Sequence, residues 1–168
     1  MKRIAIIGSS GSGKSTFANK LGKKLHRPII HLDKEYYTSE WKQKYSVKDD
    51  WINFQKSLLA KDEWIIDGNY RSSMAIRLER ADTIIFFDFP KWLCQWRVFK
   101  RSFKRDQPFD KPEGVREKIS LELIKRVMSY PTKEIYQIID GYKDRSTIFI
   151  VKNDKDAEAL LGRAGRNL

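Results

Sequence analysis

One stretch decides the fold of this chain: Ile4-Ala5-Ile6-Ile7-Gly8-Ser9-Ser10-Gly11-Ser12-Gly13-Lys14-Ser15. Its apolar start is typical of a buried strand, and the rest matches the pattern G-x-x-x-x-G-K-[ST] of phosphate-binding loops. Glycines allow backbone N–H groups to turn inward around an anion without a side-chain clash. The helix that is predicted to begin at Lys14 directs its positive end at the same anion. The stretch therefore predicts a strand, a phosphate loop and a helix in direct succession.

The residue types in the loop suit a bound nucleoside triphosphate and a metal ion. We expect Lys14 to bridge the β- and γ-phosphates, Ser15 to offer its hydroxyl to Mg²⁺, and Thr16 to approach the α-phosphate. The residues predicted to bind the nucleotide from this region are Gly8, Ser9, Gly11, Ser12, Gly13, Lys14, Ser15 and Thr16. ATP and Mg²⁺ are thus the expected cofactors. The alternative, a chance match of a turn rich in glycine and serine, is disfavoured by the strand before the loop and the amphipathic helix after it.

Short apolar runs alternate with amphipathic stretches along the rest of the chain, a pattern typical of a parallel α/β sheet. The predicted strands cover residues 4–7, 28–32, 64–66, 83–87 and 147–151. A helical pattern from about Val115 to Ile139 is expected to break or kink at Pro131. The length of 168 residues suits a single domain.

Composition limits the possible partners. The chain has 34 Lys plus Arg against 22 Asp plus Glu, a net charge of +12, which favours an anionic partner such as a nucleotide, a nucleic acid or a membrane surface. One cysteine and two histidines argue against an internal disulfide and a Cys- or His-rich metal cluster. No apolar run reaches the length of a membrane span, so we expect a soluble cytoplasmic protein without a membrane partner.

Aspartates follow several predicted strands, where an open α/β sheet binds its ligands. Asp67 follows Trp64-Ile65-Ile66 and is expected to hold Mg²⁺, either directly or through water. Asp33 follows the second strand and is a candidate base or anchor for a phosphoryl acceptor. Asp88 follows the fourth strand. The alternative for each aspartate is a helix cap or a turn.

The stretch from Trp92 to Arg105 has two helical faces. One face is aromatic and is predicted to be buried; it consists of Trp92, Trp96, Phe99 and Phe103. The other face is basic and consists of Arg97, Lys100, Arg101, Lys104 and Arg105. A polar segment with two prolines follows and is predicted to be a mobile loop. We expect a lid over about residues 97–125 whose arginines supply positive charge to a transferring phosphate; the alternative is a solvated basic face.

These motifs together resemble the adenylate-kinase-like P-loop kinases and, more closely, the bacterial group called topology modulation proteins. The shared features are the phosphate loop, His31-Leu32-Asp33, Trp64 to Arg71, Arg77-Leu78, Ala81-Asp82-Thr83, and Leu93-Cys94 with Arg97, Lys100 and Arg101. The resemblance implies a three-layer fold with a five-stranded sheet of order 2-3-1-4-5, a helical lid and ATP-dependent phosphoryl transfer. It also implies that Asp67 holds Mg²⁺ and that Arg71 holds a phosphate of the acceptor. This chain has Asn69-Tyr70 where adenylate kinases have Phe-Pro, which leaves the acceptor open.

Candidate site residues follow for each role. Lys14, Asp33, Arg97 and Arg101 are predicted to act in catalysis, and Arg105 to join the phosphate loop in binding the nucleotide. Asp33, Tyr37, Arg71 and Arg77 are predicted to contact the acceptor, although Tyr37 could equally be a packing residue. Ser15 and Asp67 are the predicted metal ligands. The acceptor could be a nucleotide, a nucleoside or another small polar molecule.

Three other classes remain open at this point. The net charge and the aromatic and basic stretch would suit a nucleic-acid-binding P-loop ATPase that affects DNA topology, although the spacing of the aromatic residues argues for their burial. A GTP switch would need an Asn-Lys-x-Asp motif, and Lys152-Asn153-Asp154-Lys155 has the wrong order. A nucleotide sensor without turnover is the third class, because a phosphate loop indicates binding only.

Overall fold

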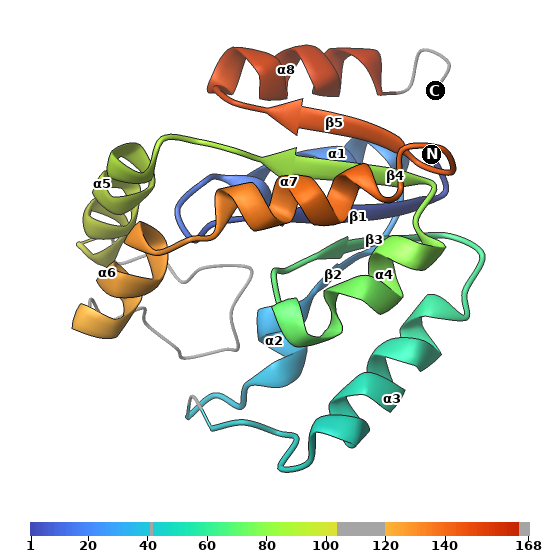
Figure 1. Cartoon of the computed structure of the whole chain (residues 1–168), viewed down its shortest axis with the longest axis horizontal. Coiled ribbons are helices and arrows are strands. Elements are labelled where there is room, and N and C mark those ends of the chain that lie inside the picture. The colour runs from blue at the N-terminus through green and yellow to red at the C-terminus, as the bar shows by residue number, and fades with distance from the viewer. Residues whose placement is uncertain (41, 104–119, 165–168) are drawn as a thin grey trace.

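The computed structural model describes residues 1–40, 42–103 and 120–164. The strands are β1 (Arg3–Gly8), β2 (Ile29–His31), β3 (Trp64–Asp67), β4 (Thr83–Phe87) and β5 (Thr147–Val151). The helices are α1 (Lys14–Leu25), α2 (Leu32–Tyr36), α3 (Lys48–Leu59), α4 (Met74–Arg80), α5 (Lys91–Ser102), α6 (Leu121–Met128), α7 (Thr132–Asp140) and α8 (Asp154–Arg163), with a 3₁₀ turn at Arg71–Ser73. Figure 1 shows their arrangement.

All five strands are parallel and pair in the order β2-β3-β1-β4-β5, which confirms the predicted sheet. β1 lies at the centre, where Ile6 is in register with Asp67 of β3 and with Ile85 of β4. Successive side chains of a strand point to opposite faces, so both faces of β1 can be apolar and buried. The phosphate loop leaves the carboxyl end of this central strand, where ligands bind in open α/β sheets.

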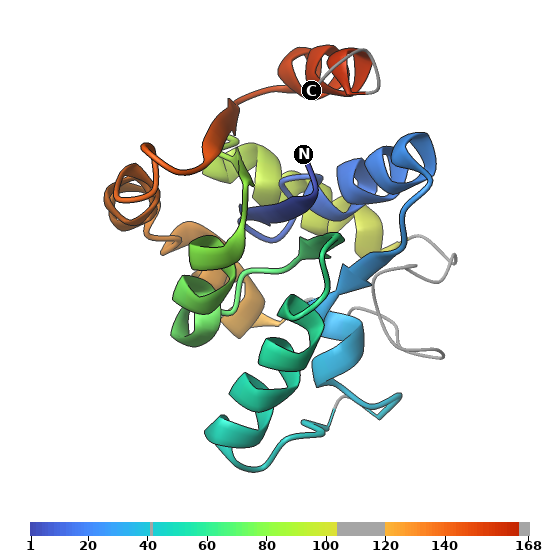
Figure 2. The same ribbon diagram turned by 90° about the vertical axis from the view of Figure 1, so that its right-hand side faces the viewer.

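Helices cover both faces of the sheet and make the three predicted layers. One core packs α1, α5, α6 and α8 against the sheet, and Ile6, Phe17 and Val98 belong to it. The other core packs α3, α4 and α7 against the opposite face, and Ile7 and Trp51 belong to it. In Figure 2, α1 (blue) and α8 (red) lie on one side of the sheet, and α4 (green) and α7 (orange) lie on the other.

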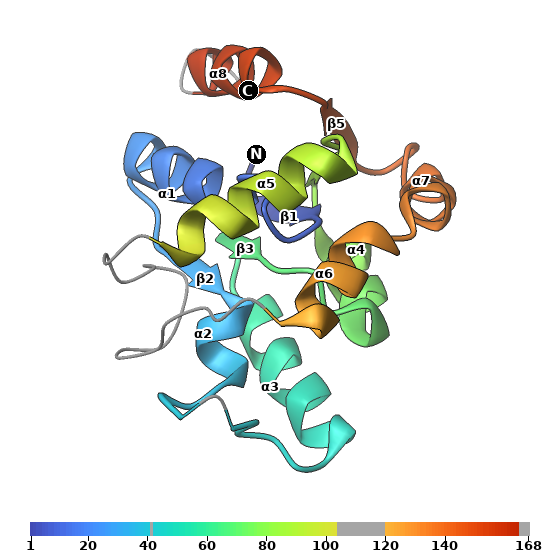
Figure 3. The same cartoon turned by 90° about the vertical axis from the view of Figure 1, so that its left-hand side faces the viewer.

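The predicted break at Pro131 is confirmed, because α6 ends at Met128 and α7 begins at Thr132. α6 begins with Ser120 as its N-cap, whose hydroxyl accepts a hydrogen bond from the backbone N–H of Leu123. This break turns the chain at the carboxyl end of the sheet, so that α6 lies beside α5 (Figure 3).

The prediction that the aromatic face of α5 is buried is wrong. Trp92, Trp96, Phe99 and Phe103 are 69%, 55%, 45% and 71% exposed. The buried residues of α5 are Cys94 and Val98, which have the same helical spacing of four. The aromatic row and the row of Cys94 and Val98 both have helical periodicity, so periodicity alone does not tell which row is buried. The row of Cys94 and Val98 is buried because α5 lies against the phosphate loop, where only small side chains fit.

The contact between α5 and the phosphate loop is centred on Gly11. Its φ of 80° lies in the left-handed region, and a Cβ placed there would overlap the backbone carbonyl of Cys94 and touch Val98. Glycine is therefore required both for the turn of the loop and for the close approach of the helix.

The expected lid falls largely on residues 104–119, which include Arg105 and lie outside the described residues. The lid therefore stays a prediction. Among the described helices, none is long and apolar enough to cross a membrane.

Candidate active site

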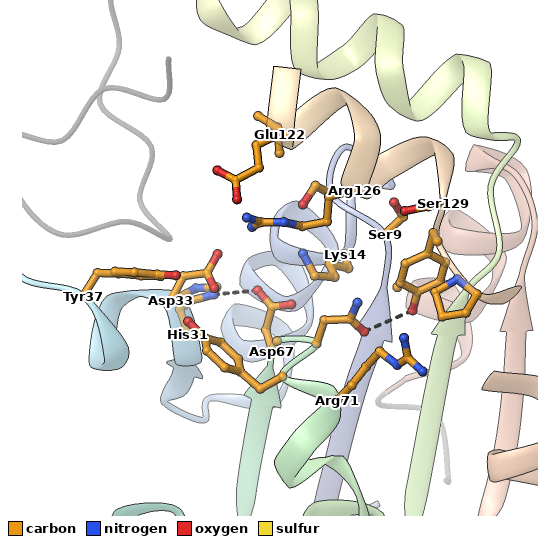
Figure 4. Close-up of a pocket in the computed structure, with 18 of the residues that line it drawn as sticks. Ser9, Lys14, His31, Asp33, Tyr37, Asp67, Arg71, Glu122, Arg126 and Ser129 are labelled. Atoms are coloured by element: carbon orange, nitrogen blue, oxygen red, sulfur yellow. Dashed lines mark hydrogen bonds and ion pairs between the residues drawn. The ribbon is translucent and has the colours of Figure 1, made fainter. Parts of the chain in front are cut away.

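A cavity of about 730 Å³ opens at the carboxyl ends of the central strands. The phosphate loop borders one end, and side chains from α2, from the segment after β3 and from α6 border the other (Figure 4). We call these the donor end and the acceptor end. The cavity is continuous between them, so two ligands can lie next to each other in it.

The donor end is formed by Gly8, Ser9, Ser10 and Lys14. Gly13, with φ of 91°, caps α1 and lets Lys14 begin the helix with its side chain in the cavity. Among the described residues, none accepts or donates a hydrogen bond to the buried Oγ of Ser9. A free hydroxyl and a lysine at a helix N-terminus are suited to binding phosphate oxygens.

The other residues predicted at the donor end lie around the loop rather than along the cavity wall. Ser12 and Ser15 are buried, and Thr16 is exposed in the first turn of α1. The roles predicted for Ser15 at a metal ion and for Thr16 at the α-phosphate stay predictions.

Strands β2 and β3 terminate side by side between the donor end and the acceptor end of the cavity. His31 ends β2 and is in register with Asp67 at the end of β3, and His31 Nδ1 lies 2.8 Å from Asp67 Oδ2. Both side chains are at least nine-tenths buried and line the cavity. The other carboxylate oxygen of Asp67, Oδ1, is buried and has no hydrogen-bond partner in the described part of the chain. A buried oxygen of this kind next to a phosphate loop fits a Mg²⁺ site, with Asp67 as the carboxylate that binds the ion or its water.

The sequence analysis missed His31 as a site residue. The signal was present, because His31 precedes Asp33 by two residues at a predicted strand end. No group of three or more His, Cys, Asp or Glu that could hold a metal occurs in the described residues, so a Mg²⁺ ion here would depend on the nucleotide phosphates for further ligands.

Asp33 and Tyr37 stand on and just after α2 and form one wall of the acceptor end. Burial, together with the nearby carboxylate of Asp33, raises the pKa of the Tyr37 hydroxyl. The same two causes raise the pKa of Tyr70, which lines the cavity on the same side, next to Tyr36. Both phenols therefore stay protonated at neutral pH, and the hydroxyl of Tyr37 can donate a hydrogen bond to an acceptor molecule.

An aromatic cluster supports this wall from behind. Tyr36 makes an edge contact with Trp51 at a ring-centroid distance of 4.8 Å and with Tyr70 at 5.0 Å. Tyr37 lies against the same cluster, 4.9 Å from Tyr36. Tyr37 therefore has both roles that the sequence left open, since it packs on Tyr36 and also lines the cavity.

Two charged residues of α6 complete the acceptor end, and the sequence analysis missed both. Glu122 and Arg126 are spaced by four residues, so they share one face of the helix, and both line the cavity. In Figure 4, Arg126 reaches toward the space between Lys14 and Asp33. No hydrogen bond or ion pair ties Arg126 to another described residue. The spacing of Glu122 and Arg126 was a visible signal, but only the packing of α6 beside α5 directs that face at the cavity.

The two arginines predicted to hold an acceptor anion have different places. Arg71 lines the cavity, is about half exposed, and pairs with Glu134 of α7. Arg77 is 1% exposed, and the prediction that it contacts the acceptor is wrong. Its guanidinium donates hydrogen bonds to Gln55 Oε1 and to the carbonyl of Asn69, 3.0 Å away. Arg77 thus holds the segment after β3 in place from inside the protein.

Burial lowers the pKa of Arg77 to about 10, so it stays charged at neutral pH. The sequence could not separate Arg71 from Arg77, because both follow the same strand.

The arginines of α5 lie outside the cavity lining. Arg97 donates a hydrogen bond to the Ser12 carbonyl, pairs with Asp154 at 2.7 Å, and lies over the ring of Phe89. It therefore borders the phosphate loop on the side away from the acceptor. Arg101 is partly buried one helical turn further on. Their predicted catalytic roles stay predictions, and Arg105 lies outside the described residues.

The fold and the site define a protein with a P-loop nucleotide-binding domain. Residues 4–128 match the family model described as the AAA domain, and because this match covers more than half of the chain, the chain belongs to that family. The relative YqaC of Bacillus subtilis (strain 168), itself uncharacterized, is 26% identical over 104 residues, which are 62% of this chain and 58% of YqaC. The match with this curated relative thus spans little more than half of its length.

Two solved kinases are similar in structure. Shikimate kinase from Acinetobacter baumannii, in complex with shikimate, gives a TM-score of 0.60 at 15% identity over 97% of this chain and 90% of that chain. Deoxyadenosine kinase from M. mycoides, solved with its products, gives a TM-score of 0.55 at 15% identity over 98% of this chain and 99% of that chain. At such identities the likeness concerns the fold, which is that of P-loop kinases.

Proposed function

We propose that this protein is an ATP-dependent, Mg²⁺-assisted phosphotransferase that phosphorylates a hydroxyl group of a small polar acceptor. One observation carries the proposal: Lys14 of the phosphate loop and Asp33 line the same continuous cavity. Phosphoryl transfer depends mainly on positioning two substrates and neutralising charge, and a cavity with a phosphate loop at one end and a carboxylate at the other meets both needs.

In this proposal the donor nucleotide lies with its phosphates on the loop from Gly8 to Ser15. Backbone N–H groups and Lys14 neutralise the β- and γ-phosphates. Ser15 and Asp67 hold Mg²⁺, which, when bound, neutralises further charge on the same phosphates. His31 holds Asp67 by its hydrogen bond and fixes the direction in which the free Oδ1 points.

At the acceptor end, Asp33 accepts the proton of the acceptor hydroxyl. The hydroxyl oxygen forms a bond to the γ-phosphorus, the bond between that phosphorus and the bridging oxygen breaks, and ADP leaves. Arg71 and Arg126 bind an anionic group of the acceptor, with Arg126 in the place that Arg77 was expected to fill. Tyr37 offers a hydrogen-bond donor and a ring face to the rest of the molecule.

The experiment is to measure ADP release from ATP and Mg²⁺, alone and with panels of nucleosides, nucleoside monophosphates, hydroxy acids and polyols. We expect one class to raise ADP release well above the rate without acceptor, with a phosphorylated product in equal amount. If every class leaves ADP release at background, the protein is not a kinase for these acceptors, and the proposal fails.

A nucleic-acid-binding ATPase, including one that affects DNA topology, is the second candidate. The exposure of the aromatic row on α5 removes the expected burial of these rings as an argument against it. In the same assay this candidate requires that DNA raise ADP release while small acceptors do not.

A further inference from the structure

The outward surface of α5 and α6 is apolar to an unusual degree. Eight large apolar side chains of the described residues are exposed, and six of them lie here: Trp92, Trp96, Phe99, Phe103, Leu121 and Met128. We call this surface the α5–α6 face. Figure 3 views the molecule from the side on which α5 and α6 lie next to each other.

The area of the α5–α6 face is that of a macromolecular interface. An aromatic side chain covers about 150–250 Å², so the four rings, at 45–71% exposure, leave roughly 350–600 Å² open. Leu121 and Met128 bring the total to roughly 550–800 Å². A stable interface covers about 800 Å² on each partner, whereas monomers rarely expose an apolar patch of more than a few hundred Å².

The α5–α6 face has both a groove and protruding apolar side chains. A groove of about 290 Å³ lies between the helices and is lined by Trp92, Gln95, Trp96, Val98, Phe99 and Ile124. Phe103 and Leu121, among the most exposed apolar side chains, stand on the same surface. A hollow and projecting apolar side chains on one surface are what an interface related by a twofold axis needs.

Two of the basic residues of α5 have partners within the protein. Lys91 donates a hydrogen bond to the Met128 carbonyl, and Arg97 pairs with Asp154. Trp96 stacks on Phe99 at 5.9 Å, and Phe99 makes an edge contact with Phe103, so the rings face one another rather than standing apart as platforms for bases. Interface cores between proteins, in contrast, are rich in Trp, Phe and Met and poor in charge.

We propose that the α5–α6 face is the interface of a homodimer, with a second copy of this chain as its occupant. This inference is independent of the proposed kinase activity, because it rests on the exposed surface alone. A charge of +12 on each copy opposes association. Dimerisation driven by apolar contact should therefore become stronger as salt screens this repulsion, whereas binding of nucleic acids or anionic vesicles becomes weaker.

Sedimentation equilibrium over a wide range of protein concentration tests the proposal. The expected mass rises from 19.9 kDa toward twice that value as concentration increases, and does so at lower concentration in high salt. Trp96→Glu and, separately, Trp92→Arg should raise the dissociation constant about tenfold or more. The control Val47→Glu, at a comparably exposed apolar residue before α3, should leave it unchanged. Thermal melts of all three variants check that each is folded.

A monomer at every concentration and salt would overturn the proposal. It would also be overturned if the chain stays monomeric while single-stranded DNA or anionic vesicles bind with an affinity that Trp96→Glu abolishes. Equal dissociation constants for Trp96→Glu, Trp92→Arg and Val47→Glu would place the dimer interface elsewhere.

Discussion

The donor and acceptor ends of the cavity are built in different ways. The donor end comes from one contiguous segment, Gly8 to Lys14, and uses mostly backbone groups whose directions are set by glycines and by the start of α1. The acceptor end comes from α2, the segment after β3 and α6, and uses side chains. A backbone site can be recognised from a short motif, while a site made of separate side chains depends on the whole fold. The difference suggests that substitutions at the two ends should affect different kinetic constants.

The largest effect is expected from Lys14→Ala. Removing the charge that neutralises the transferring phosphate should lower turnover about 10³-fold, the scale of the loss of one preorganised donor or cation. The control is Lys20→Ala on the same helix, where the lysine pairs with Glu158 at the surface and should be dispensable. Steady-state ADP release and thermal melts would measure both variants. Equal activity of Lys14→Ala and the wild type would remove the donor end from the mechanism.

Asp33→Asn should impair the function of the acceptor end and leave nucleotide binding at the donor end nearly unchanged. Turnover should fall about 10²-fold with loss of the base, while the dissociation constant for ATP stays within about threefold. Asp88→Asn is the matched control, because Asp88 also follows a strand but accepts a hydrogen bond from Tyr136 and does not line the cavity. Single-turnover kinetics and nucleotide titration distinguish the two constants. If neither constant changes, Asp33 is a structural residue.

Arg77→Met tests whether the buried arginine stabilises the fold. The substitution removes the guanidinium hydrogen bonds to Gln55 and to the carbonyls of Gly68 and Asn69, so the free energy of unfolding should fall by about 2 kcal/mol. Arg71→Ala should leave the free energy of unfolding nearly unchanged, because its pair with Glu134 is exposed. Urea unfolding of both variants measures this contrast. Similar unfolding curves for the two would contradict it.

The smallest expected effect is that of Arg126→Ala. The KM for the acceptor should rise about tenfold, as for the loss of one charged hydrogen bond, and the KM for ATP should not change. Lys125→Ala, one residue earlier on α6 and outside the cavity lining, provides the control. If the KM for ATP rises instead, Arg126 contacts the nucleotide, and the boundary between the two ends must move.

The strand order and the layers were implied by the family resemblance, while the phosphate loop and the alternating apolar runs by themselves predicted a parallel α/β sheet. The donor end was predictable from the phosphate loop. Arg126 could not be placed, because its direction depends on how α6 packs on α5. The burial of Cys94 in place of Trp96 was also beyond the sequence, since both rows have helical spacing and only the close approach to Gly11 excludes large rings.

That close approach makes Cys94 a natural reporter. Cys94 is the only cysteine of the chain, it is fully buried where α5 meets the phosphate loop, and burial raises the pKa of its thiol. A thiol reagent can react with it only when α5 and the loop separate for a moment, so the labelling rate measures how often that opening occurs. A ligand that holds the loop closed should slow the reaction. The chain thus contains its own probe of loop motion, which needs no engineered label and no knowledge of the acceptor.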